Sequence, residues 1–232
     1  IITAGATETD GPPGAVVIGN ALQSIGYEVV YVTDRYSLKV MEGTAGPDSS
    51  VVEFPIAGEE ESRSFAKELL SEIAPSVIIG IERCGLTSEG LYRNMRGVDI
   101  SEYNAKADYL FESGIPSVGI GDGGNEIGLG NLADIIPTVP SLVRMPCVTT
   151  TSALVIASVS NWGGYGLVAA MSKIKGKNLL PSIEAEQALV KRNVELGAVD
   201  GPSGEAVPMV DGFTLEENSQ ALQELHDLLS AE

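Results

Sequence analysis

The sequence Gly119-Ile-Gly-Asp-Gly-Gly-Asn-Glu-Ile-Gly-Leu-Gly130, called here the glycine loop, is dense in glycine and holds two acids, Asp122 and Glu126. The apolar run at residues 115–120 leads into it and predicts a buried strand. Glycine accepts positive φ and lets backbone approach a ligand closely. We therefore expect one wall of a metal or phosphate site here. A flexible surface loop is the alternative, which the apolar residues between the glycines disfavour.

Strand and helix patterns alternate through the first half of the chain. This alternation predicts an α/β fold, a Rossmann-like doubly wound, mostly parallel sheet with helices on both faces. Residues 35–50 predict a short helix or a loop. The expected strands are residues 1–3, 28–33, 51–55, 76–81 and 115–120, and the expected helices are residues 15–25, 59–73 and 101–113.

The second half of the chain changes character. Residues 149–160 are small and apolar, which fits either a strand or a buried helix. A turn is expected at residues 161–166, followed by a helix to about Ile174. Helices at about 183–196 and 214–230 complete a helical C-terminal region. With no repeat and no linker visible, we expect a single α/β domain over residues 1–232.

The charge balance limits the partners. Fourteen Lys and Arg against 32 Asp and Glu give a net charge of −18, which disfavours nucleic acid as a partner. No apolar run reaches the roughly 20 residues that a membrane span needs, so no membrane partner is expected. No signal peptide is visible, and the expected location is the cytoplasm. The sequence leaves the oligomeric state open.

The scarcity of histidine and cysteine limits the chemistry. The chain has one histidine, His226, and two cysteines, Cys84 and Cys147, without any CxxC spacing. This disfavours a Ser-His-Asp triad, a disulfide framework and a zinc site. Carboxylates, backbone amides and a few arginines must therefore carry any reaction.

Acids follow several of the predicted strands. Ligands of parallel α/β sheets bind beyond the carboxyl ends of the strands, so we expect these acids to converge on one rim. Clustered carboxylates repel one another unless a cation compensates. Oxygen ligands without His or Cys favour Mn²⁺ or Mg²⁺, with Ca²⁺ possible and room for more than one ion. The candidate metal ligands are Glu8, Asp10, Asp34, Glu82, Asp122 and Glu126.

The remaining site residues are predicted around the same rim. We expect Asp122, Glu126 and Arg83 to be catalytic, with Arg83 or Arg96 clamping a substrate phosphate or carboxylate; an ordinary ion pair is the alternative for both arginines. The spacing Gly119-x-Gly121-x-x-Gly124 also matches a dinucleotide fingerprint, but no acid lies near Ser141 to hold the ribose. The expected contacts to a small anionic substrate are Gly121, Gly123, Gly124, Asn125, Arg83 and Asn161.

Four blocks resemble the D-glutamate cyclase-like C-terminal domain family. They are residues 8–15 (ETDGPPGA), 81–100 (IERCG through YRNMRGVDI), 119–128 (GIGDGGNEIG) and 160–165 (SNWGGY), and residues 197–201 (GAVDG) extend the match. By resemblance, Glu8, Asp10, Glu82, Asp122 and Glu126 would bind metal, with Asp34 and Asp200 as candidates for a further ligand. The chain departs from the family pattern in a shorter segment before Glu8 and in Cys84, which replaces an expected proline.

The resemblance implies two activities. The family includes an enzyme that cyclises D-glutamate to 5-oxo-D-proline, which is a lyase, and stand-alone prokaryotic proteins for which a manganese-dependent phosphatase activity is proposed. Our leading hypothesis is therefore a Mn²⁺- or Mg²⁺-dependent hydrolase, a phosphatase of a small phosphorylated metabolite. D-glutamate cyclase is the alternative, and a non-enzymatic metal- or metabolite-binding module is the third possibility.

Overall fold

The computed structural model describes Ile1 and residues 5–231. Its contacts divide the chain into two compact units. Unit 1 comprises Ile1–Val32, Tyr36–Val52 and Ser158–Glu232, and unit 2 comprises Thr33–Arg35 and Glu53–Ala157. The strand predicted at residues 1–3 includes residues 2 and 3, which lie outside the described residues. The single domain over residues 1–232 stays a prediction.

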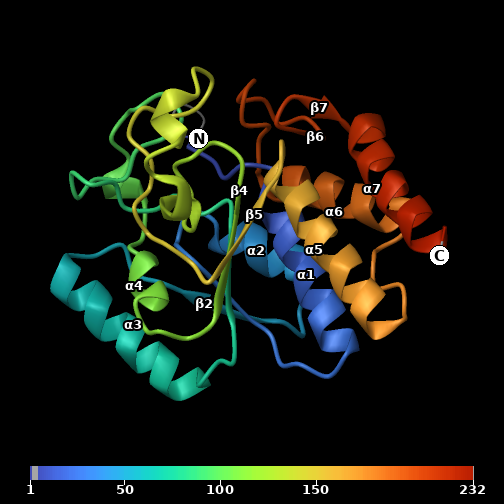
Figure 1. The fold of residues 1–232 in the computed structure, drawn as a ribbon, viewed down its shortest axis with the longest axis horizontal. Coiled ribbons are helices and arrows are strands. Elements are labelled where there is room, and N and C mark those ends of the chain that lie inside the picture. Colours follow the sequence, from blue (N-terminus) through green and yellow to red (C-terminus); the bar gives the residue numbers. More distant parts are fainter. Residues whose placement is uncertain (2–4, 232) are drawn as a thin grey trace. The chain divides into compact units, whose positions relative to one another are not determined.

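Unit 2 is built on a parallel sheet of β3 (Ile78–Ile81), β4 (Ser117–Gly121) and β5 (Ala153–Ile156), with β4 in the middle (Figure 1). The register pairs Ile81 with Ile120, so β3 and β4 end at the same edge. Parallel neighbours need crossover connections, and this arrangement confirms the predicted α/β class. The apolar segment at residues 149–160 contributes strand β5 rather than a helix.

The glycines of the loop serve close backbone packing. An added Cβ at Gly119 would lie 2.6 Å from the Ile127 carbonyl oxygen and 2.7 Å from the Gly128 Cα. Gly128 itself has a φ of 102°, a conformation that glycine adopts at little cost. The loop therefore folds back against β4, and the apolar side chains between its glycines enter the core. Ile127 is 1% exposed and Leu129 is 3% exposed.

Helix α3 (Glu59–Ile73) has the predicted bounds and lies beside α4 (Asp108–Phe111) (Figure 1). The helix predicted over residues 101–113 is wrong in extent. Only a 3₁₀ turn at Ser101–Tyr103 and the short α4 form, because Asn104 is extended and donates from its amide to the Ala105 carbonyl at 3.0 Å. This side chain competes with helical hydrogen bonding.

Unit 1 is mainly helical. Val16, Tyr31 and Met41 form one apolar cluster in it, and Val159, Val190 and Val210 form another. The helices of unit 1 are α1 (Pro12–Ser24), α2 (Leu38–Ala45), α5 (Ser160–Lys175), α6 (Ile183–Leu196) and α7 (Leu215–Ser230). Helix α1 packs against α5, α5 against α7, and α2 against α6. Strand β1 (Val30–Thr33) pairs with β2 (Ser50–Glu53), and a hairpin joins β6 (Met209–Val210) to β7 (Phe213–Thr214).

The turn predicted at residues 161–166 is wrong, because helix α5 begins at Ser160 and runs through this segment. Glycines at positions 163, 164 and 166 lower the intrinsic helix propensity. The first turn of the helix is instead stabilised by the carboxylate of Asp10, which is remote in the sequence and accepts from the Ser160 and Asn161 amides. Val168, fully buried, anchors the helix in the core of unit 1.

Candidate functional site

Two carboxylates meet at the carboxyl edge of the unit 2 sheet. Glu82 directly follows β3 and Asp122 directly follows β4, and the Glu82 backbone donates to the Ile120 carbonyl at 3.1 Å. One carboxylate oxygen from each side chain lies within 4.8 Å of the other. Glu82 has a φ of 47°, a strained backbone for a residue with a side chain. The structure therefore brings Glu82 and Asp122 together, as the strand ends predict.

Glu126 is bound by the glycine loop itself. The Gly123 and Gly124 amides donate to its two carboxylate oxygens at 3.1 and 2.8 Å, and only 1% of the residue is exposed. Burial raises the pKa of Glu126, and the hydrogen bonds from the backbone amides of Glu126, Gly124 and Gly123 oppose that rise. Glu126 thus shapes the loop, and its roles as metal ligand and catalyst stay predictions.

The predicted substrate contacts of the loop have packing roles of their own. An added Cβ at Gly121 would lie 2.9 Å from a Glu126 carboxylate oxygen, and one at Gly124 would lie 2.6 Å from Ile136. Asn125 is 8% exposed, and its Oδ1 is a buried acceptor with no hydrogen-bond partner in the described chain. Of these residues, Asn125 alone offers an unused buried polar atom.

Arg83 is engaged with Asp34. Its Nη2 lies 2.6 Å from Asp34 Oδ2 and donates to the Ala105 carbonyl at 3.1 Å. The Asp34 side chain is 5% exposed and that of Arg83 is 20% exposed, so the pair is largely shielded from water. This geometry favours the ion-pair alternative for Arg83. The clamp role of Arg83 and the ligand role of Asp34 stay predictions.

In unit 1, Asp10 caps the N-terminus of helix α5. The backbone amides of Gly11 and Asn161 donate to its Oδ1 at 3.0 and 2.8 Å, and the Ser160 amide donates to Oδ2 at 2.8 Å. Burial and the Asp211 carboxylate raise the pKa of Asp10, and the three amides oppose this. Three backbone donors and a helix N-terminus suit an anionic carboxylate.

Asn161 lies in the interior of unit 1, fully buried. Its Oδ1 accepts from the Gly11 and Gly14 amides at 3.0 and 2.8 Å, and its Nδ2 donates to the Thr9 carbonyl at 3.2 Å. Both ends of the amide are therefore used to hold the loop that carries Asp10. Asn161 is predicted to contact substrate, and the contacts favour a positioning role instead.

Sequence reasoning missed Asp211. An added Cβ at Gly201 would lie 2.6 Å from Glu8 Oε2 and 3.3 Å from Asp211 Oδ1, so these two acids flank the same glycine. Asp211 has a φ of 51° and lies between β6 and β7. The Asp-Gly dipeptide at residues 211–212 is a hairpin signal that the sequence offered. Asp200, in contrast, has a structural role, because it accepts from Ser203 and Gly212.

Comparison with known proteins agrees with this architecture. The family model described as D-glutamate cyclase-like, C-terminal matches residues 2–226. The chain belongs to this family. It is also 29% identical, over an alignment of 269 positions, to a human protein named D-glutamate cyclase, mitochondrial. The alignment covers 97% of this chain but only 43% of the relative, so the chain spans less than half of that protein's length.

Family membership confirms the resemblance of the sequence blocks. The relative bears the name of an enzyme, whereas phosphatase activity and manganese or magnesium binding find no support in the comparisons. The expected cytoplasmic location also stays a prediction, because the relative is named as mitochondrial. Within the part of the chain that the structure describes, no helix has the length and apolar character to cross a membrane.

Proposed function

We propose that this chain carries a metal-dependent D-glutamate cyclase activity. The observation that carries the proposal is the Glu82–Asp122 carboxylate pair at the edge of the parallel sheet, in a chain of this family. The family model and the named relative favour the cyclase over the phosphatase. The proposal concerns this chain alone, since the named relative is more than twice as long.

The donor set fits a hard divalent cation. Two carboxylates with oxygens within 4.8 Å of each other repel unless a cation lies between them, and oxygen-only ligands suit Mn²⁺ or Mg²⁺. Glu82 and Asp122 would hold the ion, which when bound would polarise the side-chain carboxyl of the substrate. The roles of Glu8 and Asp10 as further ligands stay predictions.

In this reaction the main role of the protein is to position the amine of the substrate against its side-chain carboxyl. The α-amine of D-glutamate attacks the carbon of its own side-chain carboxyl, an amide bond forms, and water leaves. If binding holds the substrate in a curled conformation, its conformational entropy is lost on binding and no longer contributes to the activation barrier of ring closure. The glycine loop, kept rigid by Glu126 and its backbone packing, would supply a fixed surface for this.

The test is incubation of the purified chain with D-glutamate and Mn²⁺ or Mg²⁺, with 5-oxoproline measured by mass spectrometry. L-glutamate serves as the matched substrate control, and chelation should abolish turnover. Asp122→Asn should lower turnover and metal affinity by at least about 100-fold, more than loss of a residue outside the metal's ligand sphere. Asp134→Asn, which changes an exposed acid in the same unit, should leave both unchanged.

A phosphate-ester panel is run beside it with the same metals. Hydrolysis of an ester without any conversion of D-glutamate would reverse the choice in favour of the phosphatase. Metal-dependent thermal stabilisation with no turnover on either set would instead support a binding module.

A further inference from the structure

A tight hairpin at residues 93–99, called here the 93–99 hairpin, lies in unit 2. An antiparallel bridge joins Arg93 to Asp99, and the Gly97 amide donates to the Asn94 carbonyl at 2.8 Å. The Asn94 side chain accepts from the amides of Arg96 and Val98, each at 3.0 Å. This short turn therefore has a defined conformation that fixes the direction of its tip residues, Met95 and Arg96.

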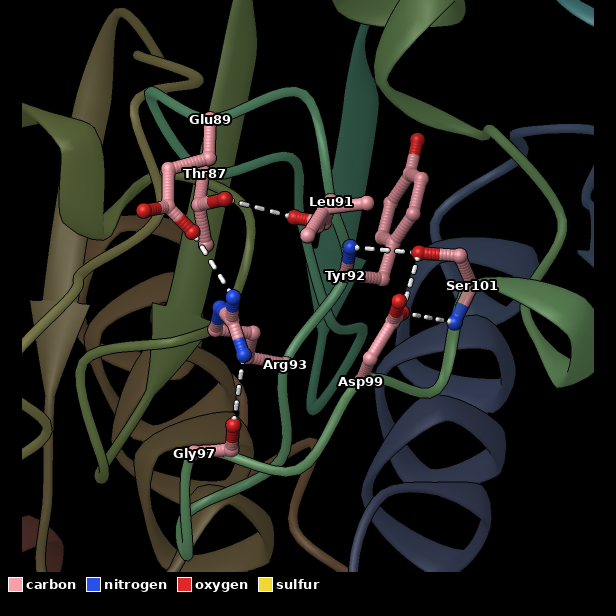
Figure 2. A network of polar contacts seen from close by, with 8 residues as sticks. All are labelled: Thr87, Glu89, Leu91, Tyr92, Arg93, Gly97, Asp99 and Ser101. Atoms are coloured by element: carbon pink, nitrogen blue, oxygen red, sulfur yellow. Dashed lines mark hydrogen bonds and ion pairs between the residues drawn. The ribbon is translucent and has the colours of Figure 1, made fainter.

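Side chains brace the base of the same hairpin (Figure 2). Arg93 donates to Glu89 and to the Gly97 carbonyl, both at 2.7 Å, and Asp99 accepts from the Ser101 amide and hydroxyl at 2.9 and 2.6 Å. The Ser101 hydroxyl in turn accepts from the Tyr92 amide at 3.0 Å. The hairpin is thus held from both of its strands.

Met95 lies on the glycine loop. An added Cβ at Gly123 would collide with the Met95 sulfur and would lie 3.0 Å from Glu126 Oε1, so the thioether and this carboxylate flank the same glycine. Gly123 directly follows Asp122 in the chain. Met95 is nonetheless 48% exposed. A flexible apolar side chain therefore covers one part of the loop while the rest of its surface stays open to a ligand.

Arg96 stands next to Met95 and is exposed. Arg83 and Arg93 form ion pairs with Asp34 and Glu89, whereas the Arg96 guanidinium has no ion-pair partner among the described residues. A guanidinium binds a carboxylate through two parallel hydrogen bonds, which gives it geometric selectivity for such a group.

We propose that Met95 and Arg96 are the substrate-recognition element of the site, and that they select a small dicarboxylate. Arg96 binds the carboxylate that the reaction leaves unchanged, and Met95 packs on the methylene groups between the two carboxylates. This inference rests on the proposed function, since the second carboxylate would be the one activated at Glu82 and Asp122. The contacts of the hairpin with the substrate are equally strong in the ground state and in the transition state, because the carboxylate that Arg96 binds does not react. They therefore lower KM without changing kcat.

The test separates recognition from turnover by using glutarate, which has both carboxylates but no amine. Binding of glutarate and of D-glutamate to the full chain is measured by calorimetry in saturating Mn²⁺. Arg96→Gln should weaken both by at least tenfold, and Met95→Ala by about threefold to tenfold. Arg144→Gln, an exposed arginine of unit 2, and Val98→Ala, 50% exposed on the same hairpin, are the matched controls and should bind as the unaltered chain does.

In the turnover assay, Arg96→Gln should raise KM for D-glutamate by at least tenfold with kcat within about twofold, the pattern of lost uniform binding. Each outcome decides one question. If the chain binds glutarate through Arg96 but never cyclises D-glutamate, the inference stands and the proposed function fails. If D-glutamate is cyclised with equal KM by Arg96→Gln, the inference fails and the function stands. If no dicarboxylate binds, the inference is overturned.

Discussion

Asp10 in unit 1 and Glu126 in unit 2 are buried carboxylates that accept hydrogen bonds from backbone amides, but the donors differ in their distance along the chain. Two of the three donors to Asp10, the amides of Ser160 and Asn161, lie 150 and 151 residues away. Those to Glu126 lie three and two residues away, at Gly123 and Gly124. One carboxylate joins remote segments, and the other fixes its own loop.

This difference has energetic consequences. A contact between remote segments must offset the entropy of closing a long loop, so its loss affects the whole of unit 1. A contact within a loop orders only that loop. Glu186 on helix α6 is a third case, because it is fully buried and its carboxylate accepts from no backbone amide of the described residues. Its Oε1 accepts from the Tyr165 hydroxyl at 3.2 Å, and its Oε2 has no partner in the described chain.

The largest effect is expected for Asp10→Ala. The substitution removes the acceptor of the Ser160 and Asn161 amides, and each buried donor left without an acceptor costs about 1–3 kcal/mol. The free energy of unfolding should therefore fall by roughly 2–6 kcal/mol. Urea unfolding monitored by circular dichroism measures this. Glu224→Ala removes an exposed acid of helix α7 and should stay within about 0.5 kcal/mol. A loss no larger than in that control would show that the remote clamp contributes nothing.

The next effect is a pH dependence at Glu186. Burial raises its pKa from 4.5 to about 7, and the pKa of the neighbouring Tyr165 is raised as well, so the phenol stays neutral. The native state therefore holds the Glu186 proton more tightly than the unfolded chain does. Stability from this group is complete below pH 4.5 and is lost as the pH rises towards 7, by about 3 kcal/mol at most.

Glu186→Gln should remove the contribution of Glu186 and flatten the slope, although the raised pKa values of Asp10 and Glu126 act in the same direction. Glu184→Gln, an exposed position on the same helix, should leave the slope unchanged. Thermal unfolding at intervals between pH 4.5 and 7.5 compares the two variants with the unaltered chain. An identical slope in Glu186→Gln would show that Glu186 does not contribute to the pH dependence of stability.

The same contrast explains what the sequence predicts and what it does not. The glycine loop, the Glu82–Asp122 pair and helices α3 and α6 follow from local patterns and from the rule that parallel strands share a carboxyl edge. Only the start of helix α5 differs from the prediction, with a helix in place of the turn at residues 161–166, because that start depends on Asp10, which no local window contains. The helix predicted over residues 101–113 is interrupted at the extended Asn104, and helix α4 starts only at Asp108, whose carboxylate accepts from the remote Leu86 amide and Tyr92 hydroxyl.

A smaller effect is expected for Glu126→Gln. The amide of glutamine keeps one oxygen acceptor and turns its NH₂ group towards the other backbone donor, so about 1–2 kcal/mol of stability should be lost. The change should be local, with faster hydrogen exchange at Gly123 and Gly124 and little elsewhere. Glu102→Gln provides an exposed control in the same unit. Global acceleration of exchange would contradict the view that Glu126 orders only its own loop.

The smallest effect is expected for Gly123→Ala, below about 1 kcal/mol. The added methyl group meets the flexible end of Met95 and approaches Glu126 Oε1 at 3.0 Å, and the thioether has open space to move into. Gly119→Ala is the informative partner, because its methyl group meets backbone atoms at 2.6 and 2.7 Å that have no room to yield, at a cost of about 1–3 kcal/mol. Urea unfolding of both variants distinguishes two uses of glycine within one loop. Equal losses would mean that Met95 is held as rigidly as the backbone, and the open surface that recognition by the 93–99 hairpin requires would then be lacking.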